Sequence, residues 1–518
     1  MPEFVILCHS IDKDKKRATD MGKNISKVSF TKRDFSTFSK KLDQQLVYLK
    51  KVIAQPHFGD ETLKIGAELE LYLVDDLGEP SLSNQLLLQK IDDPQFQPEL
   101  NQYNIELNLD AYPIKGKPFS RLRAEILEKT TNLERLAAKH NINILPVGIL
   151  PTLRSEHLTV ENMTDIPRYH CLADYLYRQR GEPFRINING EEPLSESFSG
   201  ICAEGANTSF QVHLMTKFAD FNNVFNAAQL TTPLVTAISG NSAILLGHKL
   251  WDETRIALFK QSLDIRAKDP FAWQTPTRVN FGQGWLRKNV WELFAEAVAV
   301  YPPILADICA NARPQTHANN QDELPPLHEL CLHMGTIWPW NRPVYDHHGN
   351  GHMRIEFRSI PAGPTSIDMA ANAAFAIGLA SGLAENIDDY LAVIPFNFAE
   401  DNFYRAAQDG LQAKIHWPLK HKYHPSKVAI IEVIESLLPV AKKGLYKIGI
   451  DKEEADYFLS IIEQRVAKQV TGAVWQKKTL TVFEKSLSKD LACQKLVLNY
   501  IKQCRSCQPV ATWEQIWQ

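Results

Sequence analysis

The sequence predicts an α+β protein in which a mainly antiparallel sheet is followed by a helical C-terminal region. Two patterns indicate this class. Apolar and polar residues alternate over 64–74 and over several shorter segments, as in half-buried strands, whereas apolar residues recur every three or four positions between them, as in helices. After about residue 366 the alternation stops, and consecutive helical patterns follow.

The first predicted element is an amphipathic helix that begins near residue 34. Residues 1–33 are polar and locally basic and lack a sustained apolar period, so we expect a loosely ordered extension there. Asp34 is placed to cap the helix. Its apolar stripe consists of Phe35, Phe38, Leu42, Leu46, Leu49 and Ile53.

A strand is predicted next, at residues 64–74. Leu69 and Leu71 lie on one of its faces, and Glu68 and Glu70 lie on the other. Further strands are expected at 103–109, 143–150, 184–188, 209–215 and 353–360, and helices at 119–136, 428–438, 453–466 and 487–500. Residues 366–387 are rich in alanine. We therefore divide the chain into an extension (1–33), an α+β domain (34–375) and a helical region (376–518).

Composition argues against several function classes. The 518 residues include 57 basic and 60 acidic side chains, so the bulk charge does not favour a nucleic-acid or membrane partner. The apolar run at residues 4–8 is too short for a signal peptide, and no later segment offers about 18 uncharged apolar residues. Eight scattered cysteines, with Cys504 and Cys507 as the one close pair, are typical of reduced thiols. We expect a cytoplasmic protein.

Motifs of several large enzyme classes are missing from the sequence. It contains no P-loop, no GxGxxG that opens a helix, no GxSxG and no kinase-like HRD set. His328, Glu329 and His333 imitate a zinc-protease helix. The two histidines lie five residues apart, about 140° around a helix, so they would not share a face. We therefore reject the zinc-protease interpretation.

Acidic residues on predicted strands are the informative feature. Glu68 and Glu70 share a face, Glu106 lies in an apolar alternating strand, and Glu356 has an arginine on each side of it on its own face. For any one of them, the solvated face of a half-buried strand is the alternative interpretation. Several carboxylates on one sheet face would repel each other and would need compensating cations. Mg²⁺ or Mn²⁺ suits this role, because hard cations prefer oxygen ligands.

Five segments occur in an order that resembles a known family. They are Gly66-Ala67-Glu68-Leu69-Glu70, the Glu106 strand, Phe210-Gln211-Val212-His213, Asn241-Ser242 leading to Arg255, and Glu356-Phe357-Arg358-Ser359. With these segments, residues 64–375 resemble the glutamate–cysteine ligases and related ATP-dependent carboxylate–amine ligases. The resemblance implies a catalytic domain with a curved sheet of about six strands, like that of glutamine synthetase, around ATP and Mg²⁺ or Mn²⁺.

The resemblance also implies individual site residues, matched position by position. The implied metal ligands are Glu68, Glu70, Glu99, Glu106, His213 and Glu356. The implied catalytic residues are Arg358, His213 and Arg255, the implied nucleotide-binding residues are Gln211, Arg354 and Arg358, and Arg255 is also expected to meet the substrate.

Residues 333–343 (HMGTIWPWNRP) are not a general feature of that family. Their Trp, Pro and Arg suggest a shaped loop at the mouth of the site, in which Arg342 binds the substrate acid. A packed structural loop is the alternative. For the histidines that follow we favour a solvent-exposed loop over another metal site; they are His347, His348 and His352.

The expected reaction is ATP-dependent ligation of two small molecules. A substrate carboxylate would attack the γ-phosphorus of ATP to give an acyl phosphate, and an amine would then displace phosphate to form an amide. Arginines and metal ions would stabilise the charge, without a protein nucleophile. The resemblance implies the γ-carboxylate of glutamate and an amine such as cysteine, as in glutathione biosynthesis. A non-catalytic nucleotide- or amino-acid-binding relative and a phosphotransferase on the same fold are the alternatives.

Overall fold

Antiparallel strands form a curved sheet at the centre of the protein. The computed structural model describes residues 29–266, 274–309, 324–418 and 424–517. Within them, the sheet runs in the order β13-β14-β8-β1-β3-β2 with antiparallel neighbours, and β4 and β5 also pair with β1. The strands are β1 (Lys64–Val74), β2 (Phe96–Pro98), β3 (Asn104–Asn108), β4 (Tyr112–Pro113), β5 (Asn143–Leu145), β8 (Phe210–Thr216), β13 (Asn341–Asp346) and β14 (His352–Phe357). The predicted α+β class with an antiparallel sheet is confirmed.

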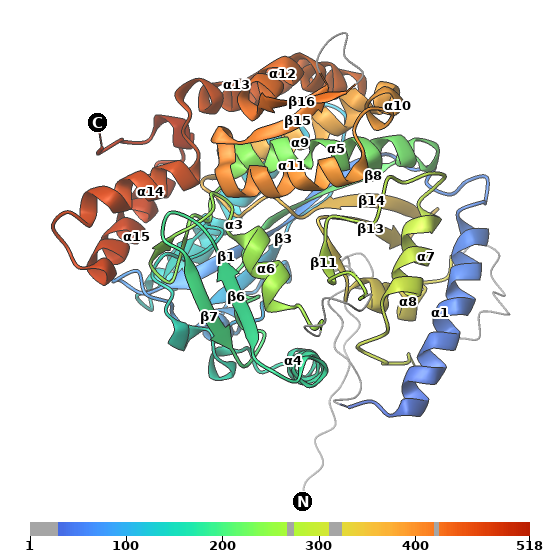
Figure 1. The fold of residues 1–518 in the computed structure, drawn as a ribbon, viewed down its shortest axis with the longest axis horizontal. Helices are drawn as coiled ribbons and strands as arrows, with labels where there is room; N and C mark the ends of the chain where they lie inside the picture. Colours follow the sequence, from blue (N-terminus) through green and yellow to red (C-terminus); the bar gives the residue numbers. More distant parts are fainter. Residues whose placement is uncertain (1–28, 267–273, 310–323, 419–423, 518) are drawn as a thin grey trace, which may run out of the picture.

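Helices cover one face of this sheet (Figure 1). Leu69, Val212 and Ile355, from three neighbouring strands, belong to the same buried apolar core as α5 (Phe221–Ser239) and α9 (Ser366–Leu383). Because side chains alternate between the faces of a strand, the polar residues beside these three, including Glu68, His213 and Glu356, must project from the opposite face. The helix layer therefore leaves the polar face of the sheet for the site.

Helix α9 is the central helix of this layer. It packs against α3 (Pro118–Ala138), α5, α12 (Ile430–Lys447) and α13 (Lys452–Lys468), so almost every residue along it is buried. The stretch Ser366–Leu391 is long and apolar enough to cross a membrane, but 94% of its apolar window is buried inside the protein. This burial is typical of a core helix of a globular protein.

The predicted strand at 184–188 pairs with β7 (Leu194–Phe198) in a separate hairpin and does not join the main sheet. The remaining helices and strands surround the core. These elements are α1 (Lys32–Val52), α2 (Asn84–Leu88), α4 (Pro167–Arg180), β6 (Phe184–Ile188), β7 (Leu194–Phe198), β9 (Ile244–Leu245), β10 (His248–Lys249), α6 (Arg255–Ser262), β11 (Val279–Asn280), α7 (Trp291–Val300), α8 (His328–Met334), β12 (Trp338–Pro339), α10 (Ile387–Leu391), α11 (Phe396–Asp409), α14 (Gly472–Phe483) and α15 (Lys489–Arg505).

Helix α1 confirms the first predicted helix but has a different cap. Thr31 is the N-cap: its Oγ1 accepts a hydrogen bond from the backbone N–H of Asp34 at 3.2 Å, and the Asp34 carboxylate accepts one from the Thr31 N–H at 2.8 Å. This reciprocal capping box puts the acidic residue three positions after the cap. Residues 1–28 of the predicted extension lie outside the described residues.

The block at 333–343 is not the loop that the sequence predicts. Its second half enters β13, an edge strand of the main sheet that pairs with β14. An edge strand accepts Pro343 because one side of it needs no ladder hydrogen bond. Trp340 is 1% exposed, and its ring packs against Phe259 and Phe403 at centroid distances of 5.8 and 5.6 Å. The packed alternative therefore describes this segment better.

The C-terminal region contains the predicted helices, here α12, α13 and α15, but also an unpredicted hairpin. Strands β15 (Lys414–Pro418) and β16 (Pro425–Ala429) pair with each other before α12 begins. The division predicted between residues 375 and 376 falls inside α9. The three-region organisation of the chain stays a prediction.

Candidate active site

The strand register places the predicted acidic residues in rows across one face of the sheet. Glu356 on β14 pairs with His213 on β8, and Glu70 on β1 pairs with Glu106 on β3. Glu68, two residues before Glu70, pairs with Gln211 on β8. Since residues two apart share a face, four strands direct these side chains to the same side.

Three of these residues form a first group, which we call the histidine trio: Glu68, His213 and Glu356. One ligand atom of each lies within 4.8 Å of the other two. His213 Nε2 lies 3.2 Å from Glu68 Oε1 but lacks hydrogen-bond geometry to it, and this buried nitrogen has no hydrogen-bond partner. The Arg354 Nε–H donates to His213 Nδ1 at 3.3 Å, which fixes the orientation of the ring.

Four carboxylates influence one another through their charges, and we call them the carboxylate cluster: Glu70, Glu99, Glu106 and Glu204. Burial, followed by the nearby Glu70 charge, raises the pKa of Glu99 and of Glu204 to about 8. Burial and the charges of Glu68, Glu99 and Glu70 raise the pKa of Glu106 well above its usual value. A bound cation would relieve such mutual repulsion.

Hydrogen bonds hold the carboxylate cluster in place. Glu70 accepts from the Ser209 N–H at 2.7 Å and from the Gln211 amide at 2.8 Å. The Asn108 amide donates to Glu106 at 2.7 Å. An all-oxygen donor set fits Mg²⁺ or Mn²⁺. The donors of the histidine trio also suit a cation, although Glu356 is already bound by arginines.

Arginines form a layer beside both groups. Arg342 Nε lies 2.5 Å and Nη2 lies 2.9 Å from the two carboxylate oxygens of Glu356, and Arg358 Nη1 bonds to Glu356 and to Gln211. These two guanidinium groups hold the pKa of Glu356 well below its usual value, although its burial acts in the opposite direction. Arg354 Nη1 reaches Asp346 at 3.2 Å.

Arg255 lies deeper than the sequence suggests. At the start of α6 it is 3% exposed, and its Nη1 bonds to Glu253 at 2.8 Å and to the Ser359 carbonyl at 3.3 Å. Its Nη2 bonds to the Arg358 carbonyl at 3.3 Å. The use of Arg255 and Arg342 as substrate clamps stays a prediction, and it requires some of these hydrogen bonds to open.

Three residues of the site were missed in the sequence. Glu204 belongs to a loop without periodicity, so nothing marked it. Arg168 and Tyr169 open α4, where only the preceding proline signals a helix start. Burial lowers the pKa of Arg168, whereas the charges of Glu99 and Glu106 favour its protonated form. The Tyr169 hydroxyl donates to the Pro98 carbonyl at 3.2 Å, so the start of α4 lies close to Glu99.

The histidines after β13 form a separate, more exposed group. Asp346, His347 and His348 bring one ligand atom each within 4.8 Å of one another. The Asp346 carboxylate accepts from the backbone N–H of His348 at 3.0 Å and pairs with its Nδ1 at 2.7 Å. The second Asp346 oxygen is bound to Arg354. The solvent-exposed loop that we favour stays a prediction for His347 and His348, whereas the half-buried His352 begins β14.

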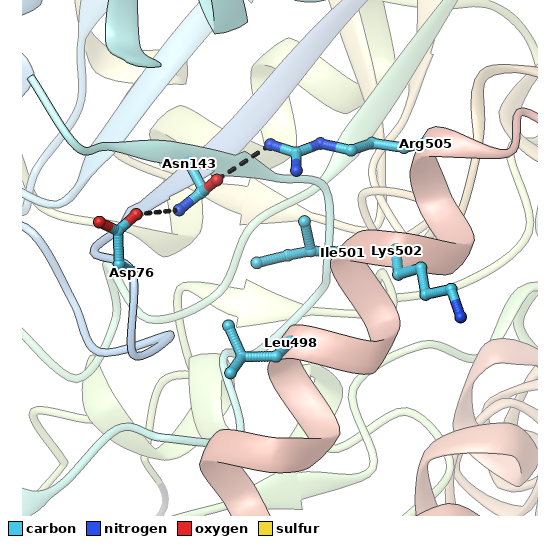
Figure 2. Close-up of a pocket in the computed structure, with 6 residues that line it drawn as sticks. All are labelled: Asp76, Asn143, Leu498, Ile501, Lys502 and Arg505. Carbon is cyan, nitrogen blue, oxygen red and sulfur yellow. Dashed lines mark hydrogen bonds between the residues drawn. The ribbon is translucent and has the colours of Figure 1, made fainter. Parts of the chain in front are cut away.

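A surface hollow of about 320 Å³ lies apart from the predicted residues (Figure 2). In it, Arg505 Nη2 donates to Asn143 Oδ1 at 2.9 Å, and the Asn143 amide donates to Asp76 at 3.3 Å. The lining residues come from the turn after β1, from β5 and from α15; they are Asp76, Asn143, Leu498, Ile501, Lys502 and Arg505. No predicted site residue lines this hollow.

Comparisons with known proteins find similar solved structures and one matching family. Similar solved structures include a glutamate–cysteine ligase from Francisella tularensis in complex with AMP (11% identity, 86% of this chain and 89% of that chain, TM-score 0.49). Another is a bifunctional glutathione synthetase from Pasteurella multocida (11% identity, 90% and 55%, TM-score 0.44). No curated protein matches by sequence. The sequence model of the glutamate-cysteine ligase family 2 (GCS2) matches residues 64–476, well over half of the chain. The protein therefore belongs to this family.

Proposed function

We propose that this protein is an ATP-dependent carboxylate–amine ligase that joins the γ-carboxylate of glutamate to the amine of a second small molecule such as cysteine. One observation carries the proposal: the register of four strands puts one set of side chains on the same sheet face as Arg358, and these are Glu68, Glu70, Glu106, His213 and Glu356. Family membership supports the ligase class, and the choice of acid and amine rests on the resemblance. The cytoplasmic location and the small-molecule substrates stay predictions.

The carboxylate cluster would hold a divalent cation, Mg²⁺ or Mn²⁺. When bound, this cation would offset the repulsion between the substrate carboxylate and the phosphates of ATP. Glu106 lies on β3 and Glu99 lies in the segment before it, whereas Glu70 lies on β1. Two strands and a connecting segment would thus hold these proposed ligands in place before any substrate arrives.

Arg358 is suited to bind the transferred phosphoryl group. Its guanidinium lies between Glu356 and Gln211, which hold it over the polar face of the sheet. Arginine can bind two phosphate oxygens at once, so Arg358 would stabilise charge that builds up on the phosphoryl group. His213 lies opposite Glu356 in the neighbouring row, and Arg354, two residues before Glu356, orients its ring.

A covalent route through the cysteine near this site is disfavoured. Cys202 lies two residues from Glu204, and burial raises the pKa of its thiol to about 12. A thiol with such a pKa supplies almost no thiolate near neutral pH. Direct attack by the substrate carboxylate on ATP agrees better with this arrangement.

The test is a screen for ADP release by the purified protein with Mg²⁺ and ATP, with amino acids supplied singly and in pairs. We expect release that requires both an acid and an amine, with at most slow release from the acid alone, and a product with the mass of an amide. A stable phosphorylated product would instead indicate a phosphotransferase. Tight ATP binding without turnover across the panel would indicate a non-catalytic relative.

A further inference from the structure

Glu253 and Arg255 form a buried ion pair behind the end of β14. Glu253 is 0% exposed and Arg255 is 3% exposed, and Arg255 Nη1 donates to Glu253 Oε1 at 2.8 Å. The same guanidinium group donates to the Ser359 carbonyl from Nη1 and to the Arg358 carbonyl from Nη2, each at 3.3 Å. Arg255 therefore holds the backbone from which the Arg358 side chain extends into the site.

Both oxygens of Glu253 face donors. Oε1 accepts from Arg255, and Oε2 accepts from the backbone N–H of Asn241 at 3.0 Å. A glutamine in this place would turn its amide N–H groups towards one of these two donors. The stem of Arg255 is also confined, because a Cβ added to Gly148 would lie 2.9 Å from its Cδ. Glu253 thus fixes the guanidinium group in one position.

Asn241 is in turn held by the C-terminal helices. Gln476 Nε2, on α14, donates to Asn241 Oδ1 at 2.8 Å, and the Asn241 amide donates to the Tyr500 hydroxyl, on α15, at 2.8 Å. All three side chains are at most 2% exposed. A Cβ added to Gly472, the first residue of α14, would lie 2.0 Å from Asn241 Oδ1. Helix α14 therefore begins in direct contact with Asn241.

These contacts connect the C-terminal helices to the site without a break. Gln476 lies 235 residues after Asn241 and Tyr500 lies 259 residues after it, so the contacts are tertiary. Hydrogen bonds in a buried environment are stronger than in water and leave few alternative arrangements. We call the connected set the buried polar network, and it consists of Arg255, Glu253, Asn241, Gln476 and Tyr500.

We propose that the C-terminal helices α14 and α15 position Arg255 and Arg358 for the reaction through the buried polar network, with Glu253 as the positioning residue that holds Arg255. The proposal rests on the ligase function above and deepens it, because it gives the C-terminal region a task in catalysis. A small displacement of a catalytic group costs rate, so a break in the network should lower kcat more than it changes the KM for ATP.

Hydrogen–deuterium exchange tests the network without any turnover. In the full-length protein, peptides that cover residues 357–363 report how firmly Arg255 holds this segment. We expect Glu253→Gln to raise the exchange rate there by at least about fivefold, because the backbone opens more often when Arg255 is free to move. Tyr500→Phe should raise it by a smaller factor.

Glu454→Gln is the matched control for Glu253→Gln. Glu454 is a buried glutamate on α13, and its carboxylate accepts from the Phe119 N–H at 2.8 Å and from the Ser120 hydroxyl at 2.7 Å, at the start of α3. The substitution should lower the thermal stability of the protein. It should leave the exchange at residues 357–363 and the kinetic constants at their wild-type values.

Steady-state ADP release, with the acid and amine found in the screen above, tests the role in catalysis. Glu253→Gln should lower kcat by at least about 10-fold, with a KM for ATP within about threefold of the wild type. Tyr500→Phe should lower kcat by about threefold in the wild type but by less than about 1.5-fold in the Glu253→Gln background, because Tyr500 acts through Glu253.

Wild-type exchange and wild-type kcat in folded Glu253→Gln would overturn the proposal. Effects of Glu253→Gln and Tyr500→Phe that simply multiply in the double variant would also overturn it. If circular dichroism shows that Glu253→Gln does not fold, Tyr500→Phe decides, since it removes one hydroxyl: unchanged exchange and kcat in this variant would overturn the proposal. Raised exchange in a protein that forms no amide would contradict the ligase function and leave the hold on Arg255 intact. An active ligase with unchanged variants would do the opposite.

Discussion

Glu106 shows how one side chain links stability to function. Its pKa is raised well above the usual value because the carboxylate is buried among Glu68, Glu99 and Glu70. We expect Glu106→Gln to relieve this repulsion and to stabilise the metal-free protein by about 1 kcal/mol at pH 7, while Mg²⁺-dependent ADP release falls by at least about 100-fold. Thermal unfolding without metal and a steady-state assay measure the two effects.

An exposed glutamate provides the matched control for this substitution. Glu128 lies on the solvent side of α3, so Glu128→Gln should change neither quantity. Full activity in Glu106→Gln would remove Glu106 from the metal ligands. A loss of stability in Glu106→Gln would show that the Glu106 carboxylate stabilises the wild type and that repulsion from its acidic neighbours does not dominate.

His333 makes the stability of the protein depend on pH. Burial, together with the nearby Arg278 charge, lowers its pKa to about 4, although a hydrogen bond to the Ala297 carbonyl acts in the opposite direction. In the unfolded chain His333 binds a proton near pH 6.5, whereas in the folded protein it stays neutral until about pH 4. The free energy of unfolding should therefore fall as the pH drops from 6.5 towards 4. The contribution is about 3 kcal/mol at the acid end.

The comparison of His333→Gln with the wild type isolates this contribution. Urea unfolding between pH 4 and pH 7.5 should show a smaller loss of stability in the variant. The exposed His57 serves as the control, since His57→Gln should follow the wild-type curve. Parallel curves for His333→Gln and the wild type would show that His333 does not titrate as described.

The face on which a site residue lies was predictable where the residue belongs to a strand with alternating apolar and polar side chains. Glu68 and Glu70 alternate with buried leucines, so their common face could be read from the sequence, and the structure places them beside His213 and Glu106. The missed Glu204 lies in a loop, where the direction of a side chain depends on tertiary contacts that no local period records.

At the scale of elements, α9 and α12 meet through glycines. A Cβ added to Gly444 would lie 2.2 Å from the carbonyl oxygen of Gly378 and 2.5 Å from the backbone nitrogen of Gly382. These are backbone atoms and cannot rotate away. We expect Gly444→Ala to push the two helices apart and to lower the free energy of unfolding by about 1–3 kcal/mol, as urea denaturation would measure.

Gly284 is a suitable control for that helix contact. An added Cβ there meets nothing within 4 Å, so Gly284→Ala should leave stability within about 0.5 kcal/mol of the wild type. If Gly444→Ala and Gly284→Ala lowered the free energy of unfolding equally, the close approach of α9 and α12 would not be the cause. The loss would then come from the reduced flexibility of the backbone.

Elements with a clear period were predictable, and β13 was not. Leu69, Leu71 and the acidic residues between them mark β1 without ambiguity. In contrast, β13 contains Pro343, and a proline precedes it at position 339, so it has the composition of a loop. Its strand conformation comes from pairing with β14, a tertiary effect that outweighs local propensity.

At the scale of the whole molecule, a buried ion pair ties the C-terminal region to the core. Arg465 on α13 is 1% exposed, and its Nη2 lies 2.8 Å from Asp368 Oδ1 on α9. Asp368 also accepts from the Val510 N–H at 3.1 Å. Arg465→Met leaves this carboxylate buried without its cation, so we expect a loss of about 3–5 kcal/mol in the free energy of unfolding.

The double variant Arg465→Met/Asp368→Asn tests the cause of that loss. Removing both charges should recover part of the stability, because the unpaired charge accounts for most of the penalty. Urea unfolding of both variants, followed by fluorescence and circular dichroism, gives the two energies. A loss below about 1 kcal/mol in Arg465→Met would mean that the pair contributes little.

The overall charge and the length of the chain predicted neither the site nor the packing of the helices. A net charge of -3 does not reveal that four carboxylates gather at one sheet face while buried arginines lie beside them. The apolar periods of the C-terminal region predicted the order of its helices. They did not predict that these helices pack around α9, because a period shows which face of a helix is apolar and does not show which other helix that face contacts.

The two-residue spacing of the site restricts where this chain can gain or lose residues during evolution. One inserted residue within β14 would turn Glu356 towards the apolar helix layer and bring Ile355 or Phe357 into the site, since register shifts exchange the two faces. The same holds for β1 and β8. Deletions and insertions in related proteins are therefore expected in the connecting turns, and the strands themselves should vary only by substitution.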